Sequence, residues 1–490
     1  MIGLAMSPSG ESAGIHDIPV VDLPRFRGEL ADGIRGGDWL ASLSVVPFDG
    51  ESRLLAVMIE PRTGKIRLLM ALPGRAYPTL SPEVPQAHRF EREIFEKDGI
   101  VPEGHQWLKP LRFNRPGDRP GVTNFFSVGG GEVHEVAVGP VHAGVIEPGH
   151  FRFQCHGERV MHLEIALGYQ HRGVEKSLVG GPGIRTVSVM ETLAGDTSIG
   201  HALAYAQAME SLSGVQAPPR AQALRAVALE LERMANHTGD LGALSGDVAF
   251  LPTASYCGRL RGDFLNLTAL ICGSRFGRGL VRPGGVAFDV DGERSGLILA
   301  RLHDAVHDFG EATRLLWDAS SVAARFERIG MVDKKAALDI GLVGPAARAS
   351  GVPRDVRFEC PAGWYREVPL LPAIEQAGDV MARARIRWQE VHQSAVFVRQ
   401  ALGSLPDGGI MSGATQLRPD SVAVSLVEGW RGAICHVAVT GPDGKFSSYK
   451  VVDPSFHNWS GLAWAMRDMQ ISDFPLCNKS FNLSYCGHDL

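Results

Sequence analysis

The chain is organised around the stretch from Gly139 to Glu210. It begins GPVHAGVIEPGHFRFQCHGERV, continues through GYQHRGVEK and ends METLAGDTSIGHALAYAQAME. The first part alternates apolar and polar residues around Pro-Gly and His-Gly breaks, which predicts short strands joined by tight turns. From Thr197 onward, alanine and leucine recur at helical spacing behind a Ser/Thr cap, which predicts a helix.

The same stretch gathers charged and imidazole side chains near strand ends and near one helix start. Soluble proteins place such groups there when something binds. The stretch therefore predicts a binding or catalytic site, and its members are His142, Glu147, His150, Arg172, Glu175 and His201.

Composition excludes several classes of protein. The 490 residues carry a net charge of −5 with both signs mixed, so a nucleic-acid partner is not expected. The seven cysteines are scattered and include no C-x-x-C pair, which argues against a zinc site or an iron–sulfur cluster bound by this chain alone. They are typical of reduced, buried thiols in a cytoplasmic protein.

The N-terminal residues and the apolar runs carry no targeting signal. The opening MIGLAMSPSGESAGIHD lacks a cationic region and contains Pro and Gly, so we expect no signal peptide. No run of about 18 apolar residues occurs, so we expect no membrane-spanning segment.

Two domains are predicted. Residues 1–18 are polar and are expected to form a flexible leader. Residues 19–117 contain three apolar runs between Trp39 and Leu72, split by DG and TG turns, and then a helix over HRFEREIFEKD that stops at Gly99. Residues 118–132 are rich in Pro and Gly and are expected to form a linker to the second domain, 133–490.

The second domain is expected to contain a bundle of long helices. Amphipathic patterns cover residues 218–244, 295–329 and 379–402, each longer than a typical globular helix. Near the end, AICHVAVT and KFSSYKVV flank a GPDG turn, which predicts a β-hairpin. The fold class is therefore α+β.

Seven motifs in order carry a family resemblance. They are GPVHAGVIEPGHFRF, GYQHRGVEK, VSVMETLAGDTSIGHALAY, ELERMANHTGDLGAL, RFGRGLVRPGGV, VEGWRG and YKVVDPSFHNW. Together they resemble the large subunit of energy-converting nickel–iron hydrogenases and the hydrogenase-like, quinone-site (D-type) subunit of respiratory complex I. The N-terminal part, with its Pro-rich run, acidic helix and Gly-Ile stop, resembles the C-type subunit of complex I, fused ahead as in formate-hydrogenlyase-type hydrogenases.

The resemblance implies that the hydrogenase metal ligands are absent. Nickel and iron in such a centre are held by four thiolates, which are soft ligands suited to nickel. Alignment of the motifs places Ala194, Thr197, Ser455 and Asn458 at those four positions. We therefore expect no metal and an emptied cavity lined by these residues.

The resemblance also implies roles for a polar shell around that cavity. Glu147 matches the glutamate that passes protons near nickel, and Arg431 matches the arginine that leans over the metal. Arg172 and Glu175 match a pair that faces the iron–sulfur cluster of a small partner subunit. A structural alternative is that Arg172 and Glu175 form a buried ion pair that holds a loop.

In complex I the emptied cavity holds the quinone headgroup. A histidine of the first hairpin loop hydrogen-bonds the quinone there, and His142 and His150 are its candidate counterparts. The family's tyrosine across the cavity is replaced by Thr186, which cannot act as a phenolic proton donor.

Other polar residues have structural interpretations. His201 and His237 are expected to be capping or core histidines rather than catalysts. Glu91 and Glu93, in the acidic helix, are expected to lie on a solvated face, with docking against a partner subunit as the alternative.

The resemblance implies a subunit of a membrane-associated oxidoreductase, peripheral on the cytoplasmic side of the inner membrane. Expected partners are an iron–sulfur small subunit that carries a 4Fe-4S cluster and antiporter-like membrane subunits; the chain itself is expected to bind no cofactor except a quinone. Two interpretations remain open: an acceptor site completed beside the partner's cluster, and a non-catalytic coupling scaffold. A third, an active nickel–iron hydrogenase, conflicts with the missing ligands.

Overall fold

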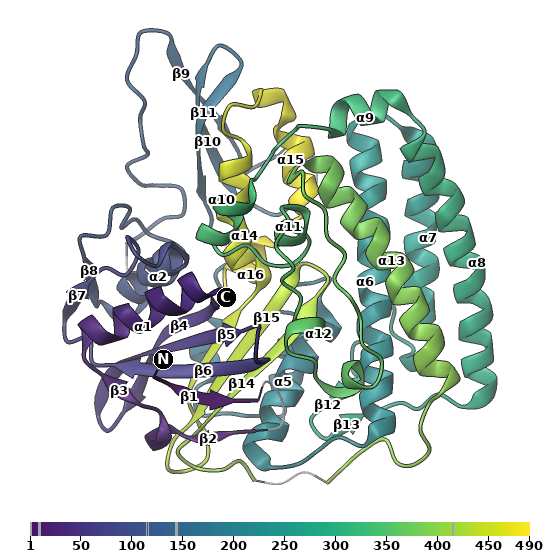
Figure 1. The fold of residues 1–490 in the computed structure, drawn as a ribbon, viewed down its shortest axis with the longest axis horizontal. Coiled ribbons are helices and arrows are strands. Elements are labelled where there is room, and N and C mark those ends of the chain that lie inside the picture. Colours follow the sequence, from purple (N-terminus) through teal and green to yellow (C-terminus); the bar gives the residue numbers. More distant parts are fainter. Residues whose placement is uncertain (1, 8–10, 114, 116, 143–145, 414–415) are drawn as a thin grey trace.

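The computed structural model describes residues 2–7, 11–113, 115, 117–142, 146–413 and 416–490. The N-terminal sheet lies beside a central sheet, and long helices stand upright on the far side of that central sheet (Figure 1). A hairpin-like projection, β9 to β11, rises above both (Figure 1). The predicted α+β fold class is confirmed.

The N-terminal sheet confirms the three apolar runs. Strands β4 (Trp39–Phe48), β5 (Glu51–Glu60) and β6 (Lys65–Ala71) pair antiparallel in sequence order. The flexible leader is wrong over its described part: β1 (Leu4–Met6) pairs with β6, and β2 (Ala13–Gly14) pairs with β14 of the second domain. Backbone hydrogen bonds to two existing sheet edges order this polar segment.

Helix α2 (His88–Asp98) ends as predicted, because Gly99 adopts the left-handed conformation, with φ of 72°, that favours glycine. Its acidic residues do not face solvent: Glu91 is 0% exposed and Glu93 is 4% exposed. The solvated-face interpretation is therefore wrong. Glu91 accepts hydrogen bonds from the Leu80 amide and the Thr79 hydroxyl, and Glu93 meets Lys450 of the second domain at 2.6 Å.

The central sheet is β14 (Ser421–Gly429), β15 (Gly432–Thr440) and β16 (Phe446–Val452), with β2 at its edge. The pair β15–β16 confirms the hairpin predicted around the GPDG turn. A second antiparallel sheet contains β9 (Val133–Val138), β10 (His150–His156) and β11 (Arg159–Ala166).

The predicted helix bundle is present. It contains α6 (Pro219–Asp247), α7 (Leu251–Cys272), α8 (Gly292–Trp317) and α13 (Val380–Gly403), side by side in Figure 1, with α5 (Ser198–Ser213) crossing the central sheet. The helix predicted over 295–329 is instead two, because α8 ends at Trp317 and α9 (Ser320–Phe326) follows. The intervening Asp-Ala-Ser sequence competes for backbone hydrogen bonds. Helix α7 was not predicted.

The remaining elements connect these layers. They are β3 (Val20–Val21), α1 (Leu23–Gly36), β7 (Ala76–Pro78), β8 (Val101–Glu103), α3 (Val174–Leu178), α4 (Thr186–Met190), β12 (Val281–Arg282), β13 (Gly285–Val286), α10 (Lys334–Asp339), α11 (Gly344–Ala349), α12 (Val356–Glu359), α14 (Pro454–Ala465), α15 (Phe474–Phe481) and α16 (Tyr485–His488). The predicted linker, 118–132, contains neither helix nor strand.

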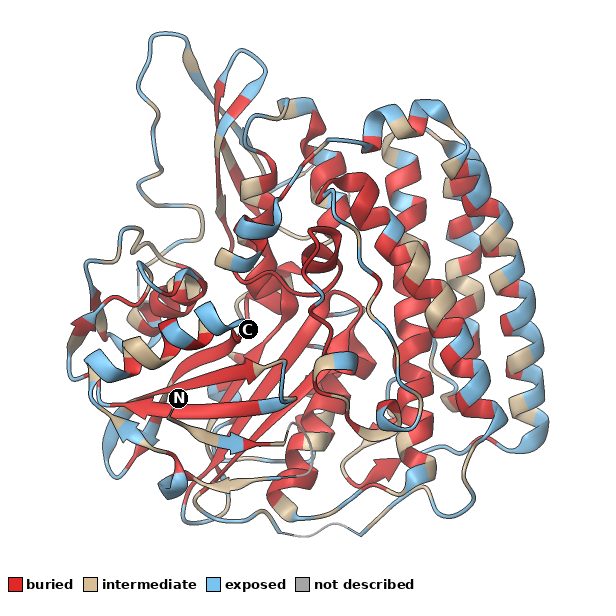
Figure 2. Cartoon of the chain, in the orientation of Figure 1, coloured by how far each residue is buried: buried red, intermediate tan, exposed pale blue. Residues whose placement is uncertain are grey.

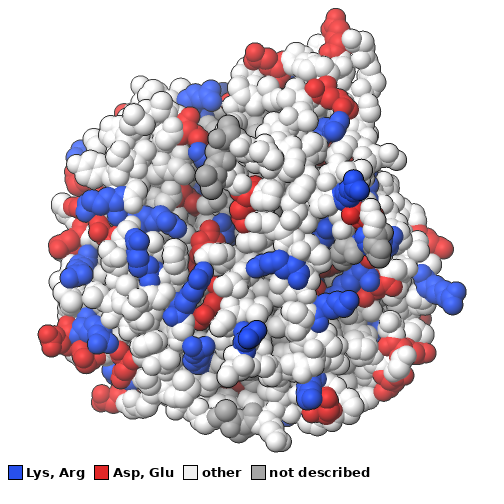
Figure 3. Space-filling model, turned by 180° about the vertical axis from the view of Figure 1, so that it is seen from behind, with Lys and Arg blue, Asp and Glu red and all other residues white. Residues whose placement is uncertain are grey.

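Burial follows the layers. Both large sheets and α6 are almost wholly buried, whereas α8 is buried on one stripe only (Figure 2). The apolar core of the N-terminal sheet is continuous with that of the central sheet, since Leu55 and Val57 share one cluster with Val424 and Phe456. Among the described residues, no helix combines the length and apolarity needed to cross a membrane. On the rear face, acidic and basic side chains are interspersed (Figure 3).

Candidate functional site at the start of helix α5

Two of the positions at which the resemblance places the missing metal ligands lie in the turn that leads into α5. Ala194 and Thr197 are 0% and 1% exposed, and the Thr197 amide donates to the Ala194 carbonyl at 3.0 Å. The Thr197 hydroxyl accepts a hydrogen bond from the indole N–H of Trp430 at 3.1 Å. These positions are therefore engaged in the protein's own hydrogen bonds.

Arg431 is neutralised by Asp196, which lies in the same turn. Its guanidinium donates to both carboxylate oxygens, at 2.6 and 2.8 Å, and also to the Asn482 carbonyl. Burial alone would raise the pKa of Asp196, but the charge and hydrogen bonds of Arg431 lower that pKa below its ordinary value. The arginine expected to lean over a metal instead forms a two-point ion pair with a residue that sequence reasoning did not single out.

A buried glutamate lies under the same helix start. Glu232, on α6, accepts hydrogen bonds from the Ile199 and Gly200 amides at 2.7 and 3.2 Å. Burial raises the pKa of Glu232 to about 8, although these two amides oppose the shift. Asp196 and Glu232 are thus two acids whose environments move their pKa values in opposite directions, a pattern typical of proton-handling sites.

The C-terminal segment joins the site. The Ser484 amide donates to the Ser455 hydroxyl at 2.9 Å, and the Tyr485 amide donates to the Glu147 carboxylate at 3.3 Å. Cys486 follows, where burial first and the nearby Glu147 charge second raise the pKa of its thiol to about 11. Ser484 and Cys486 were not predicted as members of the site, because nothing in the local pattern SYCG indicates which residues lie near it in the fold.

The other two of these four positions, Ser455 and Asn458, have different hydrogen-bond partners. Ser455 lies in the first turn of α14 and contacts the C-terminal segment as described. Asn458 makes a reciprocal pair with the Val343 backbone, at 3.0 and 3.1 Å, which fastens the loop before α11. The side chain of Asn458 is therefore committed to that loop.

Arg172 and Glu175 do not pair with each other. Arg172 is exposed and donates to the Thr192 and Leu193 carbonyls at 3.0 Å each, directly before Ala194. Glu175 is buried and meets Lys450 at 2.8 Å and Lys97 at 2.9 Å. The buried-pair interpretation is wrong, because the lysines of β16 and α2 take the position beside Glu175.

The rings of the two hairpin histidines, His142 and His150, are only partly hydrogen-bonded within the described part of the chain. His150 begins β10, and its Nδ1 lies 3.1 Å from the Gly139 carbonyl. The Nε2 atoms of His142 and His150 are buried and have no hydrogen-bond partner among the described residues. Residues 143–145 of this loop lie outside the described residues. Thr186 caps its own turn, since its hydroxyl accepts from the Gly183 amide at 2.9 Å.

His201 and His237 confirm their structural interpretation. His201 lies between Asp453 and His436, at 3.1 Å from each, and is fully buried. His237 is also fully buried and meets Glu390 at 2.8 Å.

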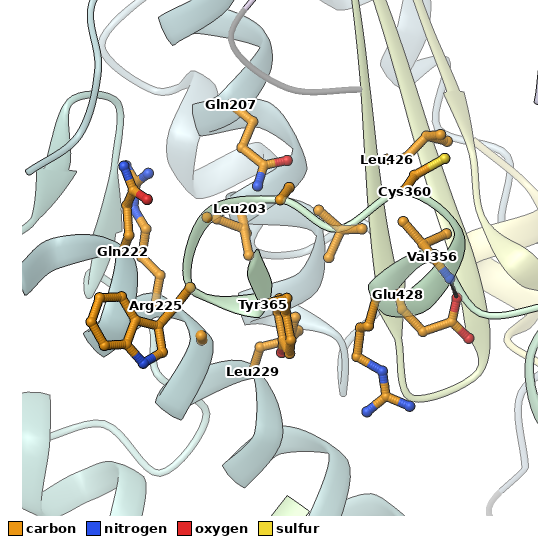
Figure 4. A pocket seen from close by; sticks show the side chains of 16 residues that line it. Leu203, Gln207, Gln222, Arg225, Leu229, Val356, Cys360, Tyr365, Leu426 and Glu428 are labelled. Atoms are coloured by element: carbon orange, nitrogen blue, oxygen red, sulfur yellow. Dashed lines mark hydrogen bonds between the residues drawn. The ribbon is translucent and has the colours of Figure 1, made fainter. Parts of the chain in front are cut away.

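A small cavity lies on another side of α5 (Figure 4). It measures about 40 Å³ and is enclosed by α5, α6, β14 and the segment 356–365. Glu428 on its wall accepts the Val356 amide at 3.0 Å, and Tyr365 donates to Glu230 at 2.6 Å. Its polar groups are therefore engaged within a buried ion network rather than directed at the α5 turn.

Comparison with known proteins places the chain in a family. The family described as respiratory-chain NADH dehydrogenase, 49 Kd subunit, matches residues 247–420. The chain is 30% identical over 350 residues to the carbon monoxide-induced hydrogenase of Rhodospirillum rubrum, covering 71% of this chain and 97% of that protein. It is 31% identical over 371 residues to NADH-quinone oxidoreductase subunit 4 of Thermus thermophilus, covering 70% and 90%.

A longer match extends into the N-terminal domain. The chain is 29% identical over 438 residues to formate hydrogenlyase subunit 5 of Escherichia coli, covering 84% of this chain and 77% of that protein. The motifs around Gly139–Glu210, the helix bundle and these identities agree. The chain belongs to the family that unites the 49-kDa subunit of respiratory-chain NADH dehydrogenase with the related hydrogenase subunits.

Proposed function

We propose that this chain is a metal-free subunit of a hydrogenase-related, membrane-associated oxidoreductase, and that His142 and His150 help to form a site for a quinone or another two-electron acceptor. The observation that carries the proposal is the pair of buried, unpartnered Nε2 atoms of these two histidines among the described residues. Buried polar groups normally have partners, so two vacant ring nitrogens in one hairpin point to a ligand or ordered water.

The residues at the former metal position do not fit a nickel–iron centre. Alanine cannot ligate, and the hydroxyl and amide groups of Thr197, Ser455 and Asn458 are hard donors already engaged in hydrogen bonds. Cys486 is the thiol near Glu147, and burial keeps it protonated. The ion pair between Arg431 and Asp196 holds the turn before α5 in place.

His142, His150 and Glu232 can take part in proton transfer. An Nε2–H can donate to a carbonyl oxygen of a quinone; for His150, whose Nδ1–H donates to the Gly139 carbonyl, this requires the imidazolium form. Reduction of a quinone by two electrons also requires two protons. Burial raises the pKa of Glu232 to about 8, which favours its protonated form near neutral pH, and its carboxyl group accepts amides of the first turn of α5, just after Asp196. We propose that His142 and His150 orient the acceptor and that Glu232 holds a proton for its reduction.

Partner subunits are supported by the relatives and by the surface. The relatives are named as subunits of formate hydrogenlyase, of a membrane-bound hydrogenase and of NADH-quinone oxidoreductase. Val141 and Ile146 are exposed in the hairpin loop, and Val179 and Ile184 are exposed in the loop after Glu175. We propose that these apolar residues, with Arg172, contact an iron–sulfur small subunit, and that antiporter-like subunits anchor the complex on the cytoplasmic side of the membrane.

The test uses the complex purified by a tag on this chain. Electron transfer from the reduced partner to a soluble quinone analogue is measured for the paired variant His142→Ala, His150→Ala. We expect kcat/KM to fall by about tenfold or more, the effect of a lost positioning or proton-donating group. The matched control is His303→Ala, an exposed histidine of α8. Equal rates for the paired variant and the wild type would contradict the acceptor site.

A second candidate is the coupling scaffold, which the Arg431–Asp196 ion pair favours. If the closed turn has only a structural role, the histidine variants should leave electron transfer unchanged. The variant Asp196→Asn should then disturb assembly of the complex instead. Co-purification of the partner subunits therefore separates the two candidates.

A further inference from the structure

A cleft of about 470 Å³ lies between the two domains, away from the α5 turn. One wall comes from α2 and the loop 104–107 of the N-terminal domain, and the other comes from β11 and α14. The cleft is therefore large enough for a small organic ligand.

Two arginines of α2 line the cleft without a carboxylate partner. Arg92 is 8% exposed, and its guanidinium donates to the Lys109 and Pro110 carbonyls at 3.0 and 2.8 Å. Arg89 contacts the His488 ring, while its Nε is buried without a hydrogen-bond partner. Neither guanidinium forms a salt bridge with any described residue. Buried charge of this kind normally has an ionic partner.

The carboxylates around these arginines each have other partners, including Glu96, which accepts the Leu111 and Arg112 amides at 3.2 and 2.9 Å while its charge opposes the lowered pKa of Arg92. Glu164, on the cleft wall, pairs with Lys109 at 2.7 Å and accepts the Phe126 amide at 2.7 Å. Glu91 is bound by the 79–81 loop, and Glu93 pairs with Arg112 and Lys450. Asp489 accepts the amides of the 168–170 loop.

The pKa values of both arginines are lowered, as expected for guanidinium groups that are buried without an ionic partner. Burial, followed by the charges of Arg92 and Arg112, lowers the pKa of Arg89 to about 9. Burial lowers the pKa of Arg92 to about 10. Both arginines stay charged at neutral pH, so a bound anion would stabilise them.

Planar rings contribute to the remaining walls, beside aliphatic residues such as Leu163 and Ile340. Trp107 and Trp464 both line the cleft, and the imidazole of His162 lies between Trp107 and Phe126, with ring centroids 5.8 and 4.8 Å away. The Nε2 of His162 is buried and has no partner among the described residues. Flat side chains beside a cationic end match a ligand with a flat body and an anionic end.

We infer that this interdomain cleft binds a small aromatic or heterocyclic anion, with its phosphate or carboxylate on Arg89 and Arg92 and its ring among Trp107, Trp464 and His162. The inference does not depend on the proposed function, since none of these residues belongs to the α5 site. The cleft is nevertheless connected to that site, because Trp459 on its wall donates to the Ser484 carbonyl at 3.4 Å and Arg89 contacts His488.

The test measures binding to the purified full chain by titration calorimetry. The probes are adenosine 5′-monophosphate, benzoate, inorganic phosphate and adenosine. We expect one of the two aromatic anions to bind at least about tenfold more tightly than phosphate or adenosine, since it engages both halves of the cleft. Preference between the first two probes distinguishes a phosphate ligand from a carboxylate ligand.

Two variants test whether the preferred probe binds in the cleft. Arg92→Met should weaken the preferred probe by about tenfold or more, and Trp107→Leu should reduce its affinity toward that of phosphate. Arg301→Met, on the exposed surface of α8, is the control and should bind as the wild type does. Trp107→Leu keeps the test decisive if Arg92→Met fails to fold. Absence of saturation by every probe below about 1 mM, or unchanged affinity in both cleft variants, would overturn the inference.

Discussion

Arg431 binds Asp196 through two hydrogen bonds of 2.6 and 2.8 Å, although 235 positions separate the two residues in the chain. The arginine comes from the turn between β14 and β15, and the aspartate comes from the turn before α5. This ion pair occupies the turn in which the resemblance places metal ligands, so the protein supplies from its own chain the negative charge that Arg431 requires.

Removal of Asp196 should therefore destabilise the fold. Asp196→Ala removes the two-point partner of the Arg431 guanidinium, which is 6% exposed, and leaves it only the weaker interactions with the charges of Asp453 and Asp240. We expect a loss on the order of 3 kcal/mol in the free energy of unfolding. Urea unfolding measures it. The control is Arg259→Met, whose pair with Asp308 is exposed and should contribute under about 1 kcal/mol. A loss of similar size in both variants would contradict the role of the buried pair.

Glu232 should make stability depend on pH. Its pKa is about 8 in the folded protein and near 4.5 when unfolded, so the folded state holds the proton more tightly. The stabilisation is complete below the unfolded pKa and is lost as pH rises from about 4.5 to about 8, by at most about 1.4 kcal/mol per pH unit. Glu232→Gln should flatten this part of the profile. Identical slopes for variant and wild type would show that Glu232 does not carry the effect.

Metal analysis addresses the former ligand positions. We expect the purified chain, expressed with nickel and iron in the medium, to contain no stoichiometric amount of either, because Ala194 and Thr197 offer no thiolate. Elemental mass spectrometry of the protein measures this. About one nickel per chain would contradict the expectation and would direct attention to Cys486.

Lys450 links α2 to α3, and its removal should be costly. Its ammonium group meets Glu93 of α2 at 2.6 Å and Glu175 of α3 at 2.8 Å, and all three side chains are buried. Lys450→Met leaves a carboxylate cluster with less compensation, and we expect a loss of about 3 kcal/mol or more in unfolding free energy. Lys335→Met, at an exposed lysine of α10, should change little. An equally small change in both variants would contradict the role of the buried lysine.

Partner binding should depend on exposed apolar side chains near Arg172. Ile184 is 100% exposed, so Ile184→Asp should leave the unfolding free energy unchanged while co-purification of partner subunits falls. Leu297→Asp, at an exposed leucine of α8, is the matched control. Undiminished co-purification of the Ile184 variant would place the partner on another surface.

Local pattern was enough to predict most of the elements. The three N-terminal strands, the helix that stops at Gly99, the hairpin around the GPDG turn and the long helices α6 and α13 all follow from periodicity and turn residues. The break between α8 and α9 was missed because the apolar pattern continues across Asp318. The pairing of β1 with β6 and of β2 with β14 was missed because strands of only three and two residues carry no pattern of their own.

The candidate site, like the fold, was predictable from the sequence only in part. The sequence by itself determined that the thiolates are absent and which motifs surround their positions, since residue identity decides which atoms can ligate a metal. Only the tertiary structure decided that Asp196 neutralises Arg431, that Glu175 pairs with Lys450 rather than Arg172, and that Ser484 and Cys486 join the site. The physical reason is that ion pairs and hydrogen bonds depend on distances of about 3 Å between atoms, and the packing of separate elements, rather than the spacing of residues along the chain, sets those distances.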